Sequence, residues 1–171
     1  MKVAVFYKSL TGNTGLLARE IEKALEGHQV IYCEKAEECP KADLYLVGSW
    51  TDKGTCCQEV AEFLKGLENQ KIAWFGTAGF GGSQEYYNNL FERVKEGIPA
   101  SNQLLGSFYC QGKMPEAVRN RYAAMLKEHP EDKKIQASIE NFDRAKSHPD
   151  ETDLENFRSW VRQMAEKVKE C

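Results

Sequence analysis

The chain has 171 residues, of which 42% are hydrophobic and 29% charged, and its formal net charge is −3. A chain of this length folds most simply as one domain, and a charge close to neutral argues against nucleic acid as the main partner. No apolar run approaches the roughly 20 residues of a membrane span. The N-terminus enters a β-type run directly, so we expect a cytoplasmic protein without a secretory signal.

The chain has six cysteines without Cys-x-x-Cys spacing: Cys33, Cys39, Cys56, Cys57, Cys110 and Cys171. We expect reduced thiols, not a disulfide framework. Cys56 and Cys57 are adjacent, which leaves a redox-active pair open, although a bond between neighbours closes a strained ring and free thiols at a helix start are the simpler interpretation. The three histidines lie far apart in sequence, so we expect no metal site.

The first elements form a strand, a hydroxyl-rich turn and a helix. Residues 2–7 are an apolar β-type run, and Leu17, Ile21 and Leu25 recur at the spacing of one helix face. Between them lies Ser-Leu-Thr-Gly-Asn-Thr-Gly, residues 9–15. A helix N-terminus presents unpaired N–H groups and a positive dipole end, so the turn is suited to bind a phosphate group.

The type of phosphate loop follows from what this turn contains. It has no Lys after its glycines, which a nucleotide triphosphatase loop needs, and its glycines do not fit the dinucleotide fingerprint. The pattern Ser/Thr-x-Thr-Gly-x-Thr, complete at Ser9, Thr11, Gly12 and Thr14, resembles the FMN phosphate loop of the flavodoxin family. The resemblance implies FMN binding by Ser9, Leu10, Thr11, Gly12, Asn13 and Thr14. The alternative is a capping turn rich in hydroxyl groups.

Four further apolar segments, at residues 28–33, 43–49, 71–75 and 104–110, read as strands. Helical patterns lie between them, one introduced by a capping box at Thr55-x-x-Gln58. This alternation predicts an α/β fold, a flavodoxin-like doubly wound parallel sheet of five strands in the order 2-1-3-4-5 with helices on both faces.

Beyond Gly112 the pattern becomes helical. Pro115 suits a first helical turn, a second helix carries Ile135 and Phe142, and Thr152-x-x-Glu155 reads as a capping box for the last helix. A minimal flavodoxin-like unit needs only that last helix. We therefore expect a single domain over residues 1–171 with a helical insertion at about 114–149.

In a parallel sheet of this order, the loops after the first, third and fourth strands meet at one edge. The resemblance implies flavin contacts from the last two of these loops, at Ser49, Trp50, Thr51 and Gly54, and at Thr77, Ala78, Gly79, Phe80, Gly81 and Tyr86. Trp50 is expected to stack on the ring, with core packing as the alternative, and Phe80 and Tyr86 compete for the second position.

Two features of these loops concern the tuning of the ring. Gly54 resembles the flavodoxin glycine whose carbonyl turns toward ring nitrogen N5 on reduction. Lys53 and Lys113 are cations expected near the crevice, and the end of the fifth strand borders it. The glycine-rich loop at residues 76–83 departs from the family's usual Gly-Asp…Tyr pattern.

Two functions fit this sequence. The first is an FMN-binding electron-transfer protein that shuttles electrons between two partner proteins, a reductase donor and an acceptor enzyme. It follows from the small size and from the lack of a Ser-His-Asp or Cys-His arrangement. The second is an FMN-dependent NAD(P)H or quinone oxidoreductase, favoured by the glycine-rich loop, Lys113 and the added helices. A binding module that uses the fold without a flavin is a third.

Overall fold

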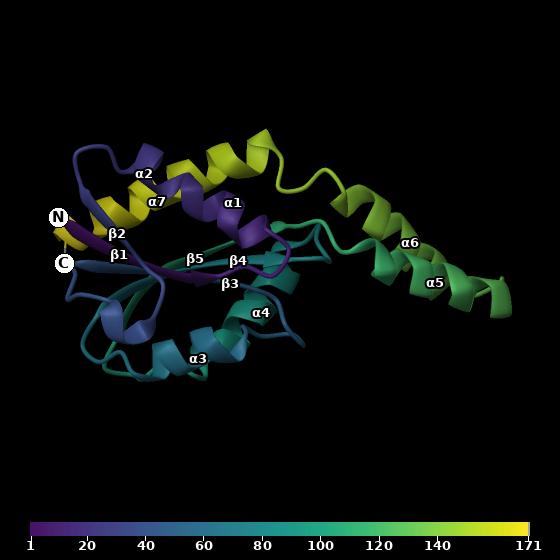
Figure 1. Ribbon diagram of the computed structural model, residues 1–171, viewed down its shortest axis with the longest axis horizontal. Helices are drawn as coiled ribbons and strands as arrows, with labels where there is room; N and C mark the ends of the chain where they lie inside the picture. Colours follow the sequence, from purple (N-terminus) through teal and green to yellow (C-terminus); the bar gives the residue numbers. More distant parts are fainter. Residues whose placement is uncertain (171) are drawn as a thin grey trace.

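The computed structural model describes residues 1–170 and contains a five-stranded parallel sheet in the order β2-β1-β3-β4-β5, with helices on both faces (Figure 1). The predicted fold class and strand order are confirmed. The strands are β1 (Lys2–Lys8), β2 (Gln29–Cys33), β3 (Leu44–Trp50), β4 (Lys71–Ala78) and β5 (Gln103–Gln111). The helices are α1 (Asn13–Arg19), α2 (Ile21–Ala24), the 3-10 turn η1 (Ala36–Glu38), α3 (Gln58–Lys65), α4 (Gln84–Lys95), α5 (Glu116–Glu128), α6 (Lys133–Ala145) and α7 (Glu151–Glu170).

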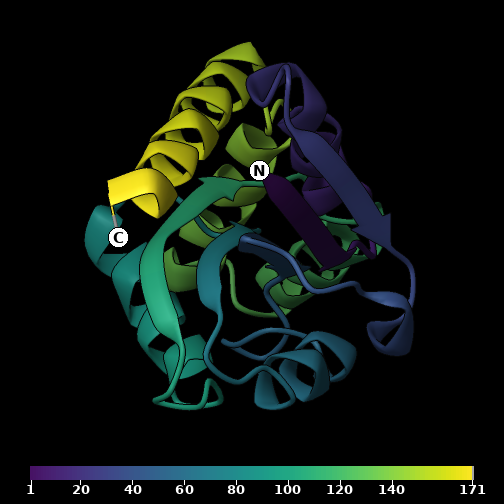
Figure 2. The same ribbon diagram turned by 90° about the vertical axis from the view of Figure 1, so that its left-hand side faces the viewer.

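The sheet separates two hydrophobic cores. Helices α1, α2 and α7 cover one face (Figure 2). In the core on this face the ring centroids of Phe75 and Phe157 lie 5.3 Å apart. Helices α3 and α4 cover the other face, where Trp74 is buried and Phe63 stacks on Phe6. Strands β3 and β4 are almost wholly buried because both of their faces are covered, which explains their continuous apolar sequences.

Three local predictions were wrong at the ends of helices. The helical pattern of residues 16–25 is interrupted at Glu20, which separates α1 from α2. Helix α3 begins at Gln58 after Cys57, so Thr55 does not cap it. Helix α7 begins at Glu151, and its reciprocal cap joins Asp150 and Asp153, each accepting the other's backbone N–H at 2.9 Å.

The expectation that the cysteines are reduced was wrong for one pair. Cys33 and Cys39 form a disulfide that closes the loop after β2, with Cα atoms 5.2 Å apart. Cys56, Cys57 and Cys110 are free and buried, and burial raises the pKa of the Cys56 thiol. A raised pKa disfavours the reactive thiolate. Cys171 lies outside the described residues.

Helices α5 and α6 form a hairpin that projects from the carboxyl-terminal edge of the sheet (Figure 1). Both lie within the segment at about 114–149 that we interpreted as an insertion. Arg119 of α5 and Asp143 of α6 form a salt bridge at 2.9 Å between Nε and Oδ1. None of the described helices is long and apolar enough to cross a bilayer.

A buried ion pair ties the break between α1 and α2 to the last helix. Glu20 is only 5% exposed, and its carboxylate accepts hydrogen bonds from Arg158 of α7 and from Lys23. Burial alone would raise the pKa of Glu20, but the hydrogen bonds from Lys23 and Arg158 outweigh it and hold the pKa below its usual value of 4.5. The charged carboxylate therefore stabilises the fold.

We predict that Glu20→Gln lowers the free energy of unfolding at pH 7 by about 2 kcal/mol, because it removes the charged partner of Arg158. The folded pKa is depressed, so the loss is full above pH 4.5 and shrinks as the pH falls through the folded pKa. Urea unfolding of the wild type and the variant at pH 7 and in acid measures this loss of unfolding free energy. Glu26→Gln, at an exposed position, is the control. A difference that does not depend on pH would contradict this account.

Candidate functional site

A crevice of about 240 Å³ opens at the carboxyl-terminal edge of the sheet. The chain turns from β1 into α1 on one face of the sheet and from β3 toward α3 on the other, so the two connections diverge and leave a gap. The crevice is lined by Leu10, Thr11 and Asn13 after β1; Trp50, Thr51 and Asp52 at and after the end of β3; Thr77, Ala78 and Gly79 at and after the end of β4; and Gly112, Lys113, Met114 and Pro115 after β5.

The loop between β1 and α1 holds a row of free hydrogen-bond donors. Within the described chain, the backbone N–H groups of residues 10–14 donate to no protein acceptor. The Gly15 N–H donates to Ser9 Oγ at 3.1 Å, which closes the loop, and Gly12 has a φ of 89° that favours glycine. The free N–H groups and the start of α1 together provide a site for an anion.

The side chains of this loop are tied to neighbouring strands. Thr14 Oγ1 lies 3.0 Å from Thr77 Oγ1 of β4 in a buried hydrogen bond. Asn13 Nδ2 donates to Thr11 Oγ1 and to the Lys113 carbonyl, both at 2.9 Å. Asn13 Oδ1 is buried and has no partner among the described residues. The crevice thus combines anion-binding donors with an unused acceptor, which suits a phosphorylated ligand that also carries hydroxyl or N–H groups.

The loop after β3 is fixed to β4. The Thr51 N–H and Oγ1 both donate to the Thr77 carbonyl at 2.9 Å. Trp50 lines the crevice, as stacking on the flavin ring requires. It also packs partly against the core on the α3 side, as the core-packing alternative requires, so its position is compatible with both interpretations. Beyond Asp52 the chain makes a two-residue hairpin turn, with positive φ at Lys53 and Gly54.

Two glycines in the crevice are required by close contacts. A Cβ at Gly112 would come within 2.5 Å of Asn13 Nδ2. A Cβ at Gly79 would come within 2.5 Å of Met114 Sδ. These separations are too short for any larger residue without movement of the crevice walls.

Half of the residues predicted for the site line the crevice: Leu10, Thr11, Asn13, Trp50, Thr51, Thr77, Ala78 and Gly79. Ser9, Gly12 and Thr14 belong to the same loop but do not line the crevice. The other five do not line the crevice: Ser49, Gly54, Phe80, Gly81 and Tyr86. The flavin contacts of all sixteen residues stay predictions.

The structure places these five residues as follows. Ser49 is buried, and its Oγ accepts the Cys57 N–H at 3.1 Å. Gly54 forms the hairpin turn. Phe80 is 43% exposed, and Tyr86 is partly buried, with its ring 5.8 Å from that of Tyr87. Gly81 lies so close to Gln111 that a Cβ on residue 81 would come within 2.8 Å of Gln111 Cδ.

The sequence analysis missed four residues of the crevice: Asp52, Gly112, Met114 and Pro115. Three of them follow β5, where the sequence analysis expected Lys113 and the end of the strand itself, Tyr109 to Gln111, to border the crevice; of these, Lys113 lines it. Pro115 precedes helix α5 as its N-cap residue and not as its first helical residue. The available signal was the position after a strand end, since all parallel strands end at this edge of the sheet.

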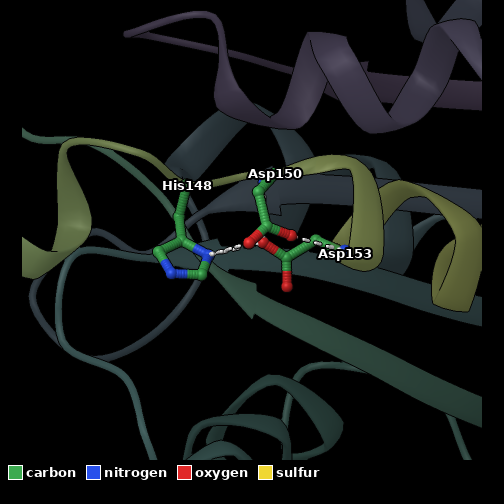
Figure 3. A group of neighbouring side chains, drawn as sticks. All are labelled: His148, Asp150 and Asp153. Carbon is green, nitrogen blue, oxygen red and sulfur yellow. Dashed lines mark hydrogen bonds and ion pairs between the residues drawn. The ribbon is translucent and has the colours of Figure 1, made fainter.

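A second cluster of polar side chains lies near this edge, where the chain returns from α6 to α7 (Figure 3). His148 Nδ1 lies 2.6 Å from Asp153 Oδ2, and Asp150 lies beside them. Asp150 Oδ1 and Asp153 Oδ2 already accept backbone N–H groups at the start of α7. We therefore interpret the cluster as the N-terminal cap of that helix.

The flavodoxin domain matches residues 4–162 of the chain. The chain belongs to the flavodoxin family. It is 33% identical to the flavodoxin-like domain-containing protein BilS of Clostridioides difficile (strain CD3) over 98% of both chains, and 35% identical to BilS of Clostridium symbiosum (strain WAL-14163) over 94% of both. Its fold is similar to a short-chain flavodoxin associated with a non-canonical PDU bacterial microcompartment, with 15% identity, a TM-score of 0.63, and coverage of 98% of this chain and 99% of that one.

FMN is the cofactor of the flavodoxin family, and the crevice fits it. The free N–H groups of residues 10–14 suit its phosphate, and the unpartnered Asn13 Oδ1 suits a hydroxyl or N–H group of the same ligand. A flat ring can enter beside Trp50 because the opposite strand ends contribute glycines.

We predict that Thr11→Val weakens FMN binding about tenfold and leaves riboflavin binding unchanged, because it removes a hydroxyl donor from the phosphate end of the site. Quenching of flavin fluorescence during titration of the apoprotein measures both dissociation constants. The exposed Thr152→Val is the matched control. An equal loss for both ligands would place Thr11 away from the phosphate.

Proposed function

We propose that this protein is an electron carrier that binds FMN without a covalent bond and passes electrons from a reductase to an acceptor enzyme. Bound FMN supplies one- and two-electron transfer. The observation that carries the proposal is the row of free N–H groups in the loop after β1, which would hold the phosphate of the cofactor at the rim of the sheet. A cofactor at the rim is within reach of a partner protein.

The side chains around the crevice support a carrier more than a catalyst. Two charged residues line the crevice, Asp52 and Lys113. Among the described residues, the lining includes no histidine and no cysteine. The backbone of Asp52 belongs to the hairpin turn: its N–H donates to the Thr55 carbonyl at 2.8 Å, and its carbonyl accepts the Thr55 N–H at 3.0 Å. Lys113 would favour a negative charge on the reduced cofactor, because an opposite charge nearby stabilises the ionised form. The cytoplasmic location stays a prediction.

The alternative is an FMN-dependent NAD(P)H or quinone oxidoreductase. The residues after β5 favour it, since Lys113, Met114 and Pro115 add to the crevice on the side of the helical hairpin. Such an addition narrows the approach to the ring and could select a small substrate.

We predict that the FMN-loaded protein keeps its visible flavin absorbance during anaerobic incubation with NADH or NADPH alone. A carrier receives its electrons from a partner protein, so its reduction needs a reductase. Dithionite is the positive control, because it must bleach the same sample. Fast bleaching by NADH or NADPH without a reductase would overturn the carrier in favour of the oxidoreductase.

A further inference from the structure

A partly buried hydrogen-bond network joins the helical hairpin to the crevice. The Gly79 carbonyl accepts hydrogen bonds from Gln111 Nε2 of β5 and from Asn141 Nδ2 of α6, both at 3.0 Å. Gln111 Nε2 also donates to Asn141 Oδ1 at 3.0 Å, which closes the network. Asn141 is only 6% exposed, and it lies 62 residues from Gly79 in the chain.

This network fixes the peptide group after Gly79. Two amide donors occupy the carbonyl oxygen, so it cannot turn toward the crevice without leaving both donors unpaired. In a trans peptide the next N–H points the opposite way from the carbonyl. The Phe80 N–H has no acceptor within residues 1–170, and its direction is therefore set by Gln111 and Asn141. Gly79 itself lines the crevice.

A second set of contacts ties the base of the hairpin to the same crevice. The Lys113 N–H donates to the His148 carbonyl at 2.9 Å, which joins the start of the hairpin to its end. The Lys113 carbonyl accepts from Asn13 of the phosphate loop. The Met114 side chain lies so close to Gly79 that a Cβ there would come within 2.5 Å of Met114 Sδ. The hairpin is thus attached to both the phosphate loop and the loop after β4.

We propose that Asn141 is a positioning residue for the flavin ring, and that the inserted helix α6 thereby sets the conformation of the loop after β4. This inference rests on the proposed FMN site. Asn141 does not touch the crevice and acts through the Gly79 peptide. A change in the hairpin at Asn141 should therefore alter the binding of the flavin ring and leave the binding of the phosphate unchanged.

Two variants test this role. Asn141→Ala removes both hydrogen bonds of the side chain, and Asn141→Asp keeps the size and the acceptor for Gln111 but loses the donor to Gly79. Each should raise the dissociation constants of FMN and riboflavin by the same factor, about tenfold, and shift the midpoint potential of bound FMN. Asn120→Ala, at an exposed position of α5, is the matched control and should change neither quantity.

The outcomes separate this role from simple anchoring of the hairpin. A lower Tm of the variants with unchanged flavin affinities and potential would overturn the proposal. The wild-type protein gives an independent test by NMR, because the Asn141 side-chain amide resonances should shift on riboflavin binding while those of Asn120 stay in place. Unshifted Asn141 resonances would overturn it even where the variants do not fold. A wild-type protein that binds neither flavin would instead overturn the proposed function.

Discussion

The backbone N–H groups of residues 10–14 are the feature on which the site depends. They run from the loop after β1 into the first turn of α1, at the edge of the sheet, and have no partner in the described chain. Donors left without acceptors are costly when they are screened from water, and an anion satisfies them. The Ser9 hydroxyl and the left-handed Gly12 hold the loop in this form before any ligand arrives.

The rest of the crevice is built around this loop. Thr14 and Thr77 join α1 to β4, and Thr51 joins the loop after β3 to the same strand. Asn13 reaches the segment after β5 through the Lys113 carbonyl. Each connection runs from one strand end to another, so the position of the phosphate site fixes the walls available to the ring. The hairpin α5–α6 enters this arrangement through Asn141 and the Gly79 peptide.

The fold was predictable because its signals are local. The apolar runs of β3 and β4 and the helical spacing around them determine the alternation of strands and helices, and the alternation determines the topology. Predictions failed where two local choices compete or where distant segments meet. Asp150 and Asp153 displaced Thr152 as the cap of α7, and the Cys33–Cys39 bond depends on the path of the loop between them.

The same distinction divides the site. The phosphate loop is contiguous, so its residues could be identified from a seven-residue pattern. The residues after β5 and Asn141 have no local pattern, because their positions depend on how the hairpin α5–α6 packs against the sheet. The contact of Asn141 with Gly79 spans 62 residues of the chain. Phe80 and Tyr86 do not line the crevice, and their contacts with the flavin ring stay predictions.

The most direct test of the central claim is a ¹H–¹⁵N NMR titration of the apoprotein with FMN. The account predicts that the backbone amide resonances of residues 10–14 shift downfield together, since their N–H groups acquire charged acceptors. Saturating FMN that leaves these resonances in place would contradict the claim that this loop binds the phosphate.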